Sequence, residues 1–108
     1  EEGDENIYLG IEQEIVVEEE IIRNISVYPN PSVEYIDLSF TNNNTLLGVI
    51  NLNIYDVMGR IVYSNKIHKP GNKGESKKRI DISRLSIGQY VLEIEAEGQK
   101  INKKFTKR

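Results

Sequence analysis

Residues 85–96 read LSIGQYVLEIEA, and this stretch decides the fold. Its first half has the form L-x-x-G-x-Y, from Leu85 through Gly88 to Tyr90. In Greek-key sandwiches a tyrosine at this spacing begins a strand, and its hydroxyl bonds back to the backbone across the preceding corner. From Tyr90 onward apolar residues recur at every second position, as in a strand with one buried face. The stretch therefore predicts a tyrosine corner followed by a strand; the alternative is a plain aromatic residue at the edge of the core.

The same alternation recurs on both sides of this stretch. The predicted strands lie at about residues 25–28, 36–40, 50–54, 60–67, 80–82, 90–96 and 101–105. Turn-forming residues separate them, at 29–31, 42–44, 56–59, 69–75, 83–88 and 97–99. No helix of ordinary length fits after residue 23, and parallel strands need long crossover connections, usually helices. The sequence therefore predicts an all-β, Ig-like Greek-key β-sandwich of about seven antiparallel strands.

Residues 56–59 read DVMG, which favours a tight hairpin loop. Asp suits the first position of a turn, and Gly suits a last position with positive φ. We therefore expect Asp56 to fix the turn through its side chain and Gly59 to adopt a left-handed conformation.

The charge of the chain is divided unevenly along its length. Nine of the 17 acidic residues lie in residues 1–22, which carry no base, whereas all 14 Lys and Arg residues lie from Arg23 onward. We interpret residues 1–23 as an acidic linker or lead-in and residues 24–108 as the sandwich domain. An acidic tail with a partner of its own is the alternative. Apolar residues before Arg23 fit either a helical face or a strand face, and we favour an irregular lead-in that becomes ordered near Ile15.

The composition provides few residues for catalysis or metal binding. The chain has no Cys and a single His, His68, so no thiolate or multi-histidine metal site can form. Calcium-loop, phosphate-loop and nucleophile-elbow motifs are absent from the sequence. Nucleic-acid binding would favour aromatics interleaved with the bases, but of the two clusters of Lys and Arg, the one at residues 66–79 has no aromatic and the one at 100–108 has only Phe105. We therefore expect no catalytic residue, no cofactor, no metal and no nucleic acid.

Four stretches stand out as motifs, in order along the chain. They are Tyr28-Pro29-Asn30-Pro31, then 54–62 with Asp56 and Gly59, then 80–90 with Leu85, Gly88 and Tyr90, and finally Lys103-Lys104-Phe105-Thr106-Lys107-Arg108. Together they resemble the type A C-terminal sorting domains of the type IX (Por) secretion system of Bacteroidetes. They are similar to that family's Y-P-N-P, D-x-x-G-[KR]-x-V and I-D-L-S-x-L-x-x-G-x-Y segments and to its basic-hydrophobic-basic ending. Thr106 departs from the aliphatic residue often found there.

The resemblance implies a non-catalytic secretion signal that directs a larger cargo protein across the outer membrane, after which the signal is usually cleaved. It implies as partners the outer-membrane translocon, its shuttle proteins and a sortase-like cysteine peptidase. Cargo would pass through the periplasm and then be secreted or held at the cell surface. We expect a monomeric domain that does not insert into the membrane.

The alternative function is an Ig-like binding or adhesion module, for example one that binds carbohydrate. Such a module displays Trp or Tyr platforms, but the chain has no Trp. We expect Tyr28, Tyr63 and Tyr90 to pack at the edge of the core.

The terminal motif is the predicted recognition site for the translocon. Phe105 would supply an apolar anchor, and the basic residues would favour encounter with an acidic surface. The predicted recognition residues are Lys103, Lys104, Phe105, Lys107 and Arg108.

Overall fold

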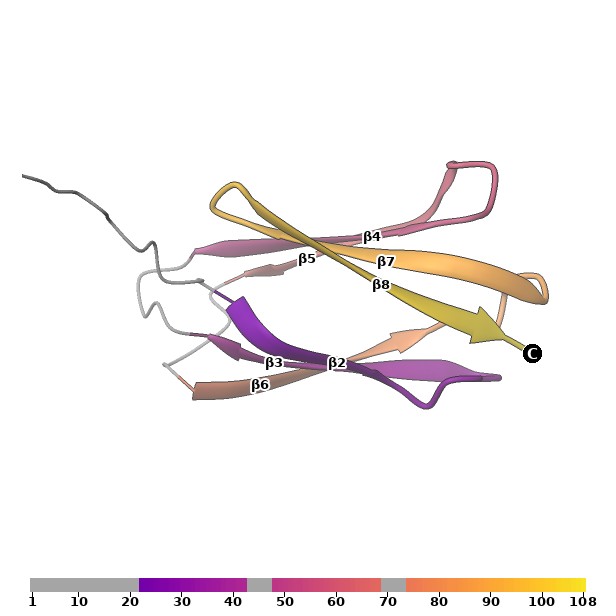
Figure 1. Ribbon diagram of the computed structural model, residues 1–108, viewed down its shortest axis with the longest axis horizontal. Coiled ribbons are helices and arrows are strands. Elements are labelled where there is room, and N and C mark those ends of the chain that lie inside the picture. The colour runs from indigo at the N-terminus through magenta and orange to yellow at the C-terminus, as the bar shows by residue number, and fades with distance from the viewer. Residues whose placement is uncertain (1–21, 43–47, 69–73) are drawn as a thin grey trace, which may run out of the picture.

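The computed structural model of the chain describes residues 22–42, 48–68 and 74–108 (Figure 1). The acidic lead-in, most of the Asn-rich turn and most of the 69–75 loop lie outside the described residues. The described part forms seven strands: β2 (Ile22–Tyr28), β3 (Tyr35–Asn42), β4 (Val49–Tyr55), β5 (Ile61–His68), β6 (Gly74–Asp81), β7 (Gly88–Ala96) and β8 (Gln99–Lys107).

These strands form two antiparallel sheets packed face to face (Figure 1). One sheet has the order β2-β3-β6, and the other has the order β5-β4-β7-β8. The chain crosses between the sheets after β3, β5 and β6, so that β6 returns beside β3 and β7 returns beside β4. The Ig-like sandwich predicted from the sequence is confirmed.

The core comes from alternate residues of the central strands, as the periodicity predicted. On β3 and β4 these side chains lie between the sheets, because alternate residues of a strand point to opposite faces. Tyr90 and the apolar residues that follow it close the core from β7. The buried apolar residues are Ile22, Ile36, Leu38, Phe40, Ile50, Leu52, Ile54, Ile80, Ile82, Tyr90, Leu92, Ile94, Ala96 and Phe105.

Some boundaries differ from the prediction. Strand β2 begins at Ile22, two residues before the predicted domain start, and Ile22 is buried. Glu75, placed in a loop from the sequence, lies in β6 opposite Thr41. Tyr28 is 39% exposed, so the prediction that it packs at the core edge is wrong. Tyr28 falls on the outer face of β2, in register with Asp37 of β3.

The β4–β5 hairpin turns as residues 56–59 predicted. The amide of Gly59 donates to the carbonyl of Asp56 (3.0 Å), and Gly59 has a φ of 81°. The Asp56 carboxylate accepts from the amides of Met58 (2.9 Å) and Arg60 (3.0 Å) and from Nε of Arg60 (2.8 Å). These bonds hold the loop in one conformation. The hydrogen bond from the backbone amide of Arg60 is the main reason that the pKa of Asp56 is lowered.

Gly59→Val should destabilise the domain by about 1–2 kcal/mol, because a left-handed conformation brings Cβ close to the following carbonyl. A Cβ at this position would meet no other atom, so the cost comes from the backbone angle alone. Gly59→Asn should cost less, since Asn tolerates this region. Urea unfolding of both variants checks the expectation, and equal losses would contradict it.

Candidate functional site

All four motifs gather at one end of the sandwich. Cross-strand pairing places Tyr28 beside Asp37, Tyr55 beside Ile61 and Gly88 beside Lys107, and the bridge between Ser32 and Lys107 joins the two sheets there. In Figure 1 this is the end at which β8 finishes. The opposite end carries the turn between β7 and β8, the end of β3 at Asn42 and the end of β5 at His68. The motifs thus lie at one end of the folded chain, although Lys103 follows Tyr28 by 75 positions in the sequence.

Hydrogen bonds from the first motif and the residue after it hold the last motif, residues 103–108, in place. The Asn30 side chain accepts from the Thr106 amide (2.9 Å) and lies 3.5 Å from the Lys104 carbonyl. The Ser32 amide donates to the Thr106 carbonyl (2.9 Å), and the Arg108 amide donates to the Ser32 carbonyl (2.7 Å). Strand β8 is the edge of its sheet, and an open edge can pair with another chain. Residues 30–32 therefore cover this edge near its C-terminal end.

The third motif forms the predicted tyrosine corner. The Tyr90 hydroxyl donates to the carbonyl of Ser86 at 2.6 Å. The Tyr90 ring stacks on Phe105 of β8, with ring centroids 5.6 Å apart. The corner thus anchors the start of β7 and supports the terminal strand at the same time.

Tyr90→Phe should fold normally and lose about 1 kcal/mol of stability, the usual net contribution of one hydrogen bond. The ring stack on Phe105 remains in this variant, so the loss of stability measures the contribution of the Tyr90 hydroxyl alone. Chemical denaturation measures it. A variant as stable as the parent would show that the bond across the corner contributes nothing.

The structure divides the predicted recognition residues into two groups. Phe105 is 2% exposed and belongs to the core, and Lys107 is 7% exposed with its Nζ bonded to the Arg108 carbonyl (3.1 Å). The side chains of Lys107 and Phe105 are therefore little accessible to a receptor in the folded domain, and their role in recognition stays a prediction. Alternation explains both, because residues 103, 105 and 107 share the inward face of β8.

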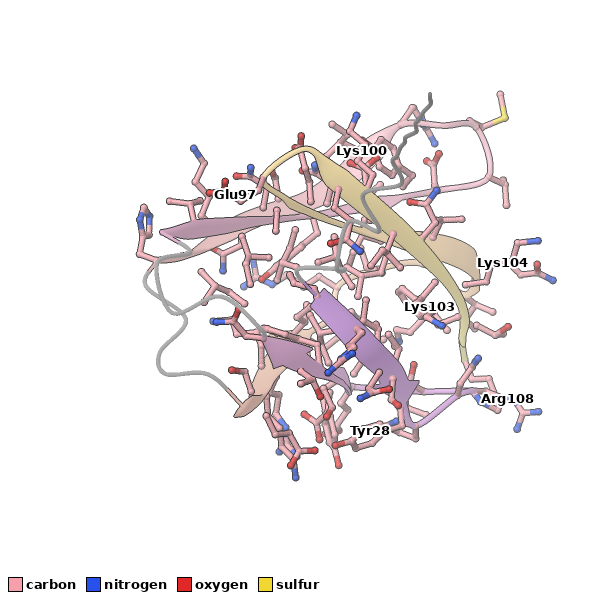
Figure 2. The ribbon with its side chains drawn as sticks, turned by 60° about the vertical axis from the view of Figure 1, so that its left-hand side comes forward. Tyr28, Glu97, Lys100, Lys103, Lys104 and Arg108 are labelled. Carbon is pink, nitrogen blue, oxygen red and sulfur yellow. The ribbon has the colours of Figure 1, made fainter. Side chains whose placement is uncertain are left out.

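The other terminal cations are accessible. Lys104 and Arg108 are exposed, and Lys103 is half-buried. Figure 2 shows Lys104 and Arg108 on the outside of this end, with Lys103 toward β2. No described carboxylate forms an ion pair with Lys104 or Arg108. Two cations that no described carboxylate pairs with therefore lie on the surface at the end of β8.

A third basic residue at this end is neutralised. The Arg79 guanidinium bonds the Asp37 carboxylate at 2.8 and 3.0 Å and lies 3.8 Å from the centre of the Tyr35 ring. The hydrogen bond from Arg79 lowers the pKa of Asp37. Arg79 belonged to the basic loop cluster read from the sequence, and pairing removes its charge from that cluster.

Sequence reasoning missed two participants, Ser32 and Ser86. Ser32 is 1% exposed and bridges the sheets, and Ser86 contributes only a backbone carbonyl. Neither role has a signal in the residue type. Among the described residues no group of three His, Cys, Asp or Glu could hold a metal ion, and none lies in a helix able to span a membrane.

A comparison with protein-family models matches residues 26–108 to the secretion system C-terminal sorting domain. The chain belongs to this family. The match covers all four motifs and the whole sandwich after the start of β2. The sorting domain is therefore a signal for type IX secretion, which carries the protein bearing it across the outer membrane to the cell surface or the medium. Domains of this family are typically non-catalytic, and they work with the secretion machinery.

Among solved structures, the crystal structure of dimeric latent PorU from Porphyromonas gingivalis resembles the sorting domain, with a TM-score of 0.60 and 20% sequence identity. The likeness covers 77% of this chain but 9% of the PorU chain, so the sorting domain corresponds to a small part of that protein. At this identity the likeness supports the fold alone. No curated protein sequence matches the sorting domain significantly.

Proposed function

We propose that the secretion machinery recognises the sorting domain at the end where its four motifs meet, and that β8 is the central part of this recognition surface. The convergence of the motifs on one surface carries this proposal. Lys104 and Arg108 provide the accessible charge, which favours encounter with an acidic receptor. Phe105 and Lys107 act by fixing the strand from within, and residues 30–32 hold it from outside.

The remaining steps follow from the family resemblance. Cargo N-terminal to the domain passes through the periplasm, where shuttle proteins and the outer-membrane translocon bind this recognition surface. In this family a sortase-like cysteine peptidase usually then removes the domain by cleavage in the linker that precedes it. The sandwich remains monomeric and supplies no catalytic group to any of these steps.

A reporter with a periplasmic export signal, fused upstream of residues 1–108, tests the proposal. In a host with type IX secretion the fusion should appear outside the cell, whereas in the same host without the outer-membrane translocon it should stay in the periplasm. A reporter without residues 1–108 serves as the control and should stay in the periplasm of both hosts. Equal export from both hosts would refute the proposal.

Limited proteolysis should nick the acidic lead-in first, somewhere before about Val17, and leave a folded remainder. The nine acids without a base repel one another and oppose compaction there. Mass spectrometry of the earliest fragments checks this. First cleavage within residues 24–108 would contradict the proposed domain boundary.

A further inference from the structure

The most exposed apolar side chains of the described residues lie together. Val57, Met58 and Ile87 are 79%, 76% and 80% exposed, and all three line one pocket of about 360 Å³. The pocket lies between the β4–β5 hairpin loop and the tyrosine corner, beside the end of β8 described above. Single exposed apolar residues are ordinary, but a cluster around a hollow marks an interaction site.

The fold does not require these residues to be apolar. The hairpin loop depends on the Asp56 carboxylate and the positive φ of Gly59, and its middle positions contribute only backbone groups. Polar residues are the usual occupants of such positions. At the corner, Ser86 supplies the bonded carbonyl while the Ile87 side chain points into solvent. Folding alone therefore gives no reason for Val57, Met58 and Ile87.

Positive charge borders this pocket. Arg84 lines it and forms no direct ion pair with a described carboxylate, although its charge acts on nearby Asp81, whereas Asp56 is paired with Arg60 at 2.8 Å. Lys104 lies beside Val57 in an adjoining hollow of about 90 Å³. Two copies of the domain paired symmetrically at this pocket would bring the positive charges of Arg84 and Lys104 together. The charge favours an acidic partner instead.

We propose that this pocket docks an acidic protein segment of the secretion machinery, whose apolar side chains fill the hollow and whose carboxylates face Arg84 and Lys104. The inference rests on the proposed function, since it assigns a surface to the same recognition. The walls are set in advance by the Asp56 bonds and by the Tyr90 bond to Ser86, so docking would need little ordering of the domain.

The test uses the reporter fusion to residues 1–108. Met58→Ser combined with Ile87→Ser should reduce export about tenfold or more, which corresponds to about 1.4 kcal/mol of lost binding. Its melting temperature should equal that of the parent because both positions are exposed. Arg84→Glu should reduce export in the same direction. Val33→Ser is the matched control: Val33 is 58% exposed at the same end but does not line the pocket, and export should stay at the parental level.

Parental export of the Met58→Ser/Ile87→Ser fusion would overturn this inference and leave the proposed function standing. Failure of the parental fusion itself to be exported would instead refute the proposed function. Two further measurements on the 108-residue chain examine other occupants, namely sedimentation for a second copy and flotation with phosphatidylglycerol vesicles for a membrane. Parental self-association or vesicle binding that the double variant loses would also overturn the inference.

Discussion

Phe105→Ala is expected to lower the free energy of unfolding by about 3–5 kcal/mol, the usual cost of truncating a buried aromatic residue. Phe105 is 2% exposed, and its ring stacks on Tyr90 at 5.6 Å. A small domain has only about 5–15 kcal/mol of stability, so the loss removes much of it. Urea unfolding of the 108-residue chain gives the value.

Phe105→Leu is the matched control, because it keeps an apolar side chain in the same space and should lose much less. Any secretion defect of Phe105→Ala would then follow from unfolding and not from a missing receptor contact. A Phe105→Ala variant with the parental unfolding midpoint would contradict the placement of Phe105 in the core.

Reversing both accessible charges, with Lys104→Glu and Arg108→Glu together, should reduce export of the reporter fusion about tenfold or more while leaving stability nearly unchanged. Exposed charges without a partner contribute little to folding, but they steer encounter with a surface of opposite charge. Secreted and periplasmic fractions of the fusion measure the first effect, and thermal unfolding measures the second. Lys66→Glu is the control, since Lys66 is exposed near the opposite end, opposite Asn51 of β4.

Lys107→Glu should behave differently from the Lys104 and Arg108 reversals. Lys107 as a residue is 7% exposed and its ammonium donates to the Arg108 carbonyl, so a carboxylate there should cost about 1–3 kcal/mol of stability. Parental export after reversal of the charges of Lys104 and Arg108 would show that the charge at the end of β8 is not part of the recognition surface. The pocket between the hairpin and the corner would then be the remaining candidate.

Local pattern was sufficient for most of the fold. Alternation located the buried residues of β3, β4 and β7, because a strand with one buried face has a strict period of two. The roles of Gly59 and Tyr90 were also predictable, because both depend on residues close in sequence. Gly59 adopts a positive φ, which favours glycine, and the Tyr90 hydroxyl bonds a carbonyl only four positions earlier. The same alternation places Lys107 on the inward face with Phe105, but its charge suggested the surface, and the long aliphatic part of lysine can pack in a core edge.

The sequence by itself determined which strands form, which residues fill the core and which family the chain resembles, because each of these depends on short-range pattern. Only the tertiary structure decided that Asn30 and Ser32 hold the end of β8, across 74 or more residues of chain. It also decided that Val57, Met58 and Ile87 share one pocket. Such contacts join the edges and turns of different sheets, and their formation depends on how the two sheets are stacked, which no local period specifies.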